Sequence, residues 1–217
     1  MEAIELEVQN IKEKISAMSV TAANMYLDAL RSLSTHDVPL ALEVIDRDKE
    51  VDRLELIIDE MCLTFLARYA PKAGELRFVV AILRLIIELE RIGDHSKVMA
   101  RQVVKFHLAP TLNALPEWQE ISILPYQMLN EAVDTFLETN VTKYAAIIKT
   151  DETVGRLQKS LNESLVSLIR RDTTHTWPAV SLINIIRRLE RIADHAKNIA
   201  ELVPYCATGE VIRHRVI

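Results

Sequence analysis

Two acidic pairs are the side chains of this chain best suited to chemistry. Glu90 and Asp94 lie four residues apart, and Glu190 and Asp194 repeat that spacing at an offset of 100 residues. Residues four apart share one face of an α-helix, so each pair places two carboxylates side by side. Carboxylate oxygens are preferred ligands of hard multivalent cations. The pairs therefore indicate candidate metal-binding positions on two helices.

The first pair continues an apolar helix face. At about 100° per residue, Glu90 and Asp94 fall in the sector that also contains Leu83 and Ile86. An ionised pair in an apolar sector is unfavourable unless a cation, hydrogen-bond donors or protons compensate for it. A metal site or a structured polar site is therefore expected there.

The histidines next to these motifs point elsewhere. His95 and His195 fall about 140° from the glutamates on the helical wheel. That sector, where we expect water, also contains Arg77, Arg84, Glu88 and Arg91. We therefore expect the two histidines to have a surface or supporting role and not to bind metal directly.

A second acidic stripe precedes the first pair. Its members, spaced by four, three and four residues, are Asp48, Asp52, Glu55 and Asp59. If the chain forms an antiparallel helical hairpin that turns near Pro71, this stripe meets Glu90 and Asp94 at one level. Carboxylates that converge in this way repel one another, and a multivalent cation with oxygen ligands relieves the repulsion.

A solvated helix face is the alternative for these acids. Acidic residues at this spacing often face water and pair with Arg or Lys, and Arg91 and Lys97 are suitable partners. The stripe at 48–59, taken alone, favours this interpretation. The aliphatic neighbours of Glu90 and Asp94 favour the metal or polar site instead.

The composition indicates an all-α protein. The 217 residues include only 4 glycines and 7 prolines, and 49% are hydrophobic, which favours long helices around a packed core. The net charge of -5 argues against nucleic-acid binding. The two cysteines match no disulfide framework or zinc motif and indicate a reducing compartment. With no secretory signal and no apolar segment long enough to cross a bilayer, we expect a cytoplasmic protein without membrane insertion.

Prolines and polar clusters divide the chain into six predicted helices. The predicted spans are residues 6–33, a segment ending near 69, 71–106, 118–137 with a later start at 126 as an alternative, 141–171 and 178–203. Leu89–His95 recurs as Leu189–His195 with six of seven residues identical, which indicates an internal repeat. We expect a first three-helix repeat at 1–109, a connector at 110–116, a second repeat at 117–206 and a C-terminal tail at 207–217. Pro110, Pro116 and Pro125 punctuate the connection between the halves.

These motifs resemble the PhoU family. The resemblance rests on the paired Leu-Glu-Arg-Ile-Gly/Ala-Asp-His blocks, the stretch 46–55, the segment 62–77 and the closing sequence 209–214, and it covers nearly the whole chain. It implies two tandem, pseudo-symmetric three-helix bundles, often as a homodimer. It also implies Glu/Asp-x-x-x-Asp pairs that hold multinuclear iron or other cations.

The resemblance assigns one metal site to each half. The first comprises Asp48, Asp52, Glu90 and Asp94, and the second comprises Asp151, Glu190 and Asp194. Gly155 stands where the pattern places the acidic partner of Asp151, and Gln158 and Asn162 replace Glu55 and Asp59. We therefore expect the first site to bind metal more tightly or to hold more ions. Iron clusters are one candidate, and zinc, magnesium, manganese and calcium are others.

The resemblance implies regulation and not catalysis. PhoU-like proteins restrain the phosphate-starvation response, so the expected partners are the ATPase subunit of the phosphate ABC transporter and a sensor histidine kinase. Two other interpretations stay open: a ferritin-like di-iron enzyme or metal store, and a purely structural helical scaffold. Di-iron bundles use Glu-x-x-His pairs. The residues three after Glu88, Glu90 and Glu190 are instead arginine, glycine and alanine.

Overall fold

Six long helices build the protein, for which a computed structural model describes residues 2–106, 115 and 117–209. The helices are α1 (Glu2–Thr35), α2 (Val38–Tyr69), α3 (Ala73–Phe106), α4 (Trp118–Glu138), α5 (Tyr144–Arg171) and α6 (Thr176–Thr208). Short 3₁₀ turns at Val141–Lys143 and Thr173–His175 precede α5 and α6. The predicted all-α class and the six helices are confirmed within the described residues.

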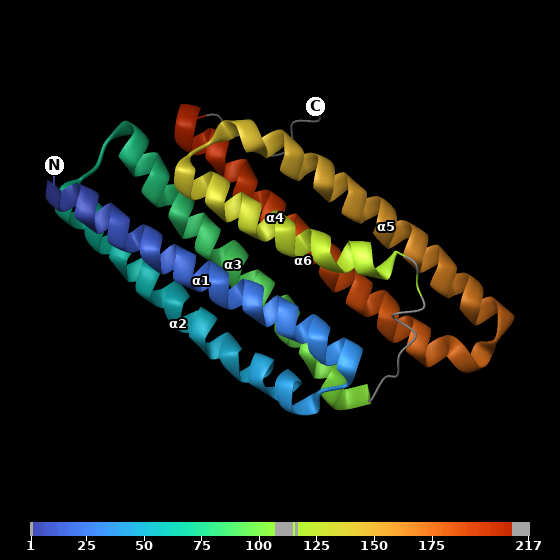
Figure 1. Ribbon diagram of the computed structural model, residues 1–217. Helices are drawn as coiled ribbons and strands as arrows, with labels where there is room; N and C mark the ends of the chain where they lie inside the picture. Colours follow the sequence, from blue (N-terminus) through green and yellow to red (C-terminus); the bar gives the residue numbers. More distant parts are fainter. Residues whose placement is uncertain (1, 107–114, 116, 210–217) are drawn as a thin grey trace.

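Local sequence signals set the ends of α2. The Asp37 side chain accepts a hydrogen bond of 2.9 Å from the Leu40 N–H, and Pro39 stands in the first turn, where its missing N–H costs nothing. At the other end, Ala70 adopts the left-handed conformation (φ 42°) and donates its N–H to the Leu66 carbonyl. These tight ends allow α2 to run antiparallel to both α1 and α3 (Figure 1).

Several predicted helix ends differ from the structure by a few residues; α1, for example, begins at Glu2 and not at residue 6. Pro125 lies inside α4 and not in a connector. Trp118 and Ile121, which precede it, are buried in the core, and that burial outweighs the backbone hydrogen bond lost at the proline. The predicted tail begins too early, because α6 continues to Thr208. The connector at 110–116, apart from Leu115, and the closing sequence after Gly209 lie outside the described residues.

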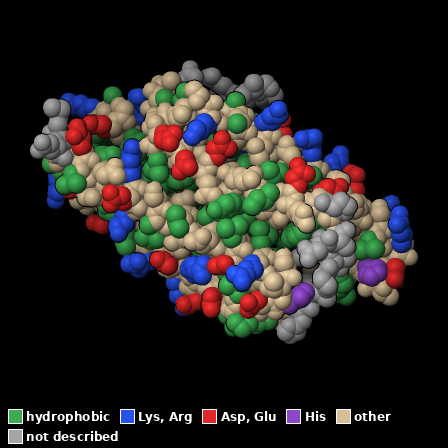
Figure 2. Space-filling model, in the orientation of Figure 1, with side chains coloured by type: hydrophobic (Ala, Val, Ile, Leu, Met, Phe, Trp, Pro, Cys, Tyr) green, Lys and Arg blue, Asp and Glu red, His purple; other side chains and the backbone are tan. Residues whose placement is uncertain are grey.

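Two three-helix bundles lie side by side (Figure 1). Helices α1, α2 and α3 pack against one another, and so do α4, α5 and α6. The bundles meet mainly where α3 packs along α6, with a smaller contact between α1 and α4. Figure 2 shows hydrophobic side chains gathered near the middle of one face, with charged side chains around them. The predicted pair of repeats therefore forms two adjoining bundles.

Contacts between the bundles are both polar and aromatic. The fully buried Tyr26 of α1 donates a hydrogen bond of 2.7 Å to the Ser122 carbonyl of α4. Phe78 of α3 stacks on Phe136 of α4, with ring centroids 5.4 Å apart. Helix α3 is thus fixed by both bundles. No helix in the described part of the chain is both long and apolar enough to span a membrane.

Candidate metal site

The acidic residues of α2 and α3 meet around one lysine. Lys97 of α3 donates hydrogen bonds to Asp48 of α2 and to Asp94 on its own helix, with 3.4 Å between Lys97 Nζ and Asp94 Oδ1. Asp48 is buried, with 4% relative exposure, so its carboxylate requires this compensating charge. The hydrogen bond to Asp48 is the main reason that the pKa of Lys97 is raised. The two acidic groups therefore meet at one level, as the predicted hairpin requires.

The other predicted groups of the first half surround this contact. Asp52 is exposed on α2, while Glu55 on α2 and Glu90 on α3 are half-buried. Burial and then the charge of Asp48 raise the pKa of Asp52. Burial and then the charge of Asp52 raise the pKa of Glu55. The site is thus an acidic crease between two helices, open to water at Asp52.

Glu90 shows that negative charge remains in excess there. Burial, followed by repulsion from Asp94, raises the pKa of Glu90 from 4.5 to about 7. Arg91 lies 3.4 Å from Glu90 and 3.6 Å from Asp94, measured between nitrogen and oxygen, but its side chain is largely exposed and compensates only in part. A carboxylate that holds a proton near neutral pH marks a place where additional positive charge is favoured.

The second half repeats the arrangement with fewer acids. Lys197 of α6 donates to Asp151 of α5 at 2.7 Å and to Asp194 at 3.0 Å. Burial lowers the pKa of Lys197, but the hydrogen bonds to these two carboxylates outweigh that effect and raise it. Burial and then the charge of Asp194 raise the pKa of Glu190. All three predicted groups of the second half therefore lie together around one ammonium.

Gly155 leaves open space at the place where the first half has Asp52. A Cβ added at Gly155 would have no heavy atom outside its own helix turn within 4 Å. Nothing in the packing therefore excludes a side chain there. The lost carboxylate is a difference in sequence and not a consequence of crowding.

The donor set fits a hard multivalent cation in its chemistry. Besides Asp59, whose charge acts on Glu55, the first half has five carboxylates, those of Asp48, Asp52, Glu55, Glu90 and Asp94. The second half keeps three at the matched positions and has Asn162 in place of Asp59. Each half supplies one lysine and one arginine against them. Among the described residues, no three His, Cys, Asp or Glu side chains converge closely enough to enclose an ion. The carboxylates thus suit a metal, but they are arranged around an ammonium group.

Sequence reasoning proposed Lys97 only as a surface partner and did not identify Lys197. A signal was available, because both lysines follow the motif aspartate by three residues and are themselves 100 residues apart. Residues three apart are neighbours on a helix surface, so each lysine can reach its aspartate. The second contact, to Asp48 or Asp151, depends on how the neighbouring helix packs.

Helix α6 covers the face of α3 that the helical wheel assigns to water. The rings of His95 and His195 lie 5.3 Å apart between centroids at this α3–α6 seam. His195 Nδ1 is 2.7 Å from Glu88 Oε2, and the same oxygen accepts a hydrogen bond from Asn198. On the other side of the seam, Arg188 Nη1 lies 3.4 Å from His95 Nδ1. Burial, followed by the charges of His195 and Arg188, lowers the pKa of His95 to about 4. The expectation of surface positions for the histidines and Glu88 is therefore wrong.

The arginines of that sector divide between internal contacts and water. Arg77 is half-buried, and its Nε donates to the Cys206 carbonyl at 3.5 Å. The exposed Arg84 guanidinium lies over the Tyr205 ring, 5.3 Å from its centroid. Arg91 is exposed beside the acidic crease. The predicted solvent face therefore holds only for Arg84 and Arg91.

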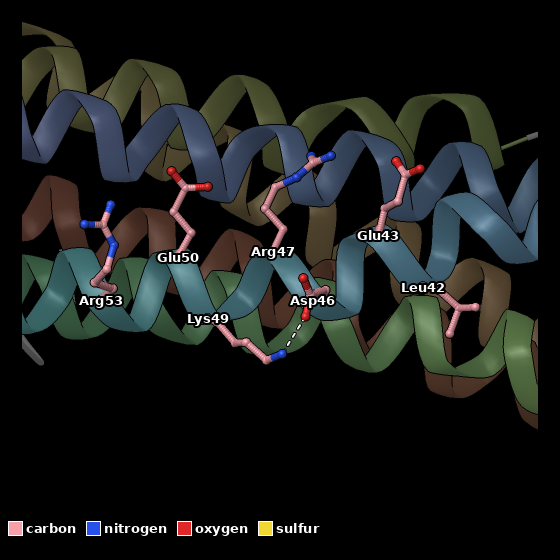
Figure 3. A pocket seen from close by; sticks show the side chains of 7 residues that line it. All are labelled: Leu42, Glu43, Asp46, Arg47, Lys49, Glu50 and Arg53. Atoms are coloured by element: carbon pink, nitrogen blue, oxygen red, sulfur yellow. Dashed lines mark hydrogen bonds and ion pairs between the residues drawn. The ribbon is translucent and has the colours of Figure 1, made fainter.

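A surface hollow on α2 does not coincide with the acidic crease. It is lined by α2 residues alone: Leu42, Glu43, Asp46, Arg47, Lys49, Glu50 and Arg53. Figure 3 shows acidic and basic side chains alternating along it, with Lys49 paired to Asp46. Arg47 also forms an ion pair of 2.7 Å with Asp28 of α1. This balanced surface offers no excess charge to a ligand.

Comparison with known proteins matches both halves of the chain. The family described as PhoU domain matches residues 15–103 and 124–203. The chain is 32% identical over 209 residues to the phosphate-specific transport system accessory protein PhoU homolog of Pseudomonas aeruginosa, covering 96% of this chain and 86% of that protein. It is 31% identical to the Aquifex aeolicus homolog, covering 97% of this chain and 96% of the relative.

Solved structures match over nearly the whole fold. The crystal structure of PhoU from Pseudomonas aeruginosa superposes with a TM-score of 0.88 at 32% identity, covering 95% of this chain and 99% of the other. The phosphate transport system regulatory protein PhoU from Streptococcus pneumoniae gives a TM-score of 0.86 at 26% identity, covering 96% and 98%. The likeness thus includes both bundles and the α3–α6 seam between them.

Proposed function

The chain belongs to the PhoU family of phosphate-transport accessory and regulatory proteins, which are not enzymes, and we propose that it is a cytoplasmic adapter restraining the phosphate-starvation response. The observation that carries this proposal is the extent of the match, which includes both repeats and 96% of the chain. The role requires helix faces that bind partners and no reacting group of its own.

The proposed partners are the ATPase subunit of the phosphate ABC transporter and a sensor histidine kinase, with a second copy of the chain completing a homodimer. Exposed apolar side chains on α2 support the existence of partner surfaces. Leu42, Leu56 and Leu63 are 51%, 71% and 49% exposed and lie at multiples of seven residues, on one helix face. Leu56 and Leu63 have the i,i+7 spacing of the apolar anchors with which one helix face contacts a partner.

We further propose that the first acidic crease binds a multivalent cation through Asp48, Asp52, Glu90 and Asp94. Candidate ions are iron, zinc, magnesium, manganese and calcium. A bound cation would supply positive charge that holds the carboxylates of α2 and α3 together. The excess of five carboxylates over two basic groups supports this site, whereas the second half is closer to balance.

Deletion of the gene in its host tests the regulatory proposal. Alkaline phosphatase activity in high phosphate should rise to the level seen in phosphate-starved cells, and wild-type chain supplied in trans should restore repression. Unchanged repression in the deletion strain would contradict the proposal. Affinity capture with the purified ATPase subunit and kinase, and with an unrelated ABC ATPase as the control, tests the partners.

Paired substitutions test the difference between the two acidic sites. Asp94→Asn and Asp194→Asn remove one carboxylate from each half at matched positions. We expect Asp94→Asn to cause the greater loss of bound metal, measured by elemental analysis of protein purified without chelators. Equal losses would show that the asymmetry is wrong. No metal in the wild-type protein under any loading condition would favour the structural scaffold.

A further inference from the structure

The same ammonium contact occurs once in each bundle. Lys97 joins Asp48 to Asp94 across α2 and α3, and Lys197 joins Asp151 to Asp194 across α5 and α6. Both lysines are half-buried, with side-chain exposures of 21% and 24%. Each therefore offers its charge to carboxylates of two helices at once.

We propose that Lys97 and Lys197 are built-in counter-ions that occupy the two acidic sites, so that a multivalent cation binds only by displacing them. This inference rests on the proposed metal function. It adds that occupancy is conditional: each site already holds one ammonium group, which a metal ion must replace.

Lys97 and a metal ion would compete because both bind the same carboxylate groups. Lys97 is hydrogen-bonded to Asp48 Oδ2 and Asp94 Oδ1, which belong to two of the four proposed ligands of the first site. An ammonium and a metal ion that share these carboxylates repel each other at short range, so their binding is mutually exclusive. Displacement is feasible, because Asp52 and Asp94 are open to water and a flexible lysine stem can turn its ammonium outward.

The two halves should differ in how strongly the lysine prevails. In the first half, five carboxylates face two basic groups, Lys97 and Arg91, which leaves three carboxylates without a counter-charge. A divalent ion is therefore attracted more strongly to this site than the singly charged ammonium group is. In the second half, Lys197 and Arg191 leave one. Lys197 also holds both of its aspartates at 3.0 Å or less. In the second site, Lys197 should therefore remain bound to its aspartates when metal is added.

Substitution of the lysines tests the proposal on the full-length chain. Mn²⁺ is a suitable probe because it accepts oxygen ligands. It is titrated by calorimetry into chelator-treated protein. Lys97→Gln keeps a hydrogen-bond donor for Asp48 but removes the charge, and Lys97→Met removes both. We expect each variant to bind Mn²⁺ about tenfold more tightly than wild type, or better, because a unit charge a few ångströms away is lost.

Lys49→Met is the matched control. Lys49 also pairs with an aspartate at i,i+3 spacing, Asp46, but it is exposed and donates to no carboxylate of the crease. This control should leave the Mn²⁺ affinity within about twofold of wild type, because the Lys49 charge lies in water.

The second site is tested with the first one weakened by Asp94→Asn and Lys97 left unchanged. In that background, Lys197→Gln should create measurable Mn²⁺ binding.

Each outcome has a distinct meaning. Wild type that binds Mn²⁺ as tightly as Lys97→Gln would overturn the counter-ion role and leave the metal site standing. No Mn²⁺ binding by wild type or by any lysine variant would overturn the metal site and the inference together. If circular dichroism shows that Lys97→Met does not fold, the Mn²⁺ affinities of Lys97→Gln and Lys49→Met are compared instead, and this comparison tests the proposal. A tighter Lys97→Gln variant beside an unchanged control supports the proposal.

Discussion

Substitution of Gly155 by aspartate should give the second half the carboxylate that it lacks. The site of the change is a helical position of α5, four residues after Asp151, where an added Cβ meets no neighbouring side chain. The first half shows the expected surroundings, because Asp52 at the matched position senses the charges of Asp48, Lys97 and Asp94. The new side chain should therefore extend from the crease into water without moving α5.

The size of the effect follows from charge and distance. A carboxylate about 6 Å from a divalent ion, the spacing of i,i+4 neighbours, contributes about 1.4 kcal/mol in water, or a tenfold gain in affinity. Partial burial increases this value. Folding stability should change by less than about 0.5 kcal/mol, because aspartate is a slightly better helix former than glycine but lies near another negative charge.

Calorimetric titration with Mn²⁺ in an Asp94→Asn, Lys197→Gln background measures the second site, with the first site weakened and the competing ammonium removed. Gly155→Asn is the control, since it has a similar size and helix propensity but no charge. We expect Gly155→Asp to bind at least tenfold more tightly than Gly155→Asn. Equal affinities for the two variants would refute the view that missing charge is what weakens the second half.

Three further predictions concern stability and reactivity. Gly93→Ala should raise the free energy of unfolding by about 0.5–1 kcal/mol in denaturant titration. The added methyl would lie 3.5 Å from Val51, which is an ordinary contact, and the second repeat has Ala193 at this position. Destabilisation would instead mean that α2 and α3 pack too closely for any side chain at position 93. Burial raises the pKa of Glu90 from 4.5 to about 7, so the folded protein binds this proton more tightly than the unfolded chain, and the stability that Glu90 contributes in chelator should fall as the pH rises from about 5 to 8. The lowered pKa of His95 acts in the opposite sense below about 6.5, so the wild type is compared with Glu90→Gln. The wild type should lose stability relative to Glu90→Gln across this pH range, and parallel pH profiles would contradict the assignment. Burial raises the pKa of the Cys62 thiol to about 12, and both cysteines are buried, so neither thiol should react with a disulfide reagent at pH 8 until the protein unfolds; rapid labelling of native protein would disagree.

The acidic crease was largely predictable because its determinants are local. The spacing of Asp48 and Asp52, and of Glu90 and Asp94, fixes which face each pair occupies. One short turn near Pro71 then brings the faces together at matching heights. Local spacing could not show that the half-buried Lys97 would bridge the two helices. That contact depends on the distance between α2 and α3, which the whole bundle sets.

The histidines illustrate the opposite case. A helical wheel assigns one buried face to a helix in a bundle, and on that basis His95 falls on the outside. Helix α3 instead is covered on two sides, by α1 and α2 of its own bundle and by α6 of the other. The charged sector that contains Glu88 is the contact between repeats, so polar residues there are paired inside the protein. A sequence with an internal repeat invites this error, because the surface that joins two copies is as polar as a solvated one.

The seam also explains why the halves diverge at matched positions. An exact copy would place identical residues at 88 and 188, and two glutamates or two arginines would flank the two adjacent histidine rings. The chain has Glu88 on one side and Arg188 on the other, so His195 meets a carboxylate and His95 meets a guanidinium. Because Glu88 and Arg188 have opposite charges at equivalent positions, each histidine has a charged neighbour and the two charges of the seam cancel. The same divergence appears at the acidic sites, where Gly155 replaces a carboxylate. The fold therefore conserves the backbone of the repeat, while single side chains distinguish a charge-rich site from one that its own lysine nearly neutralises.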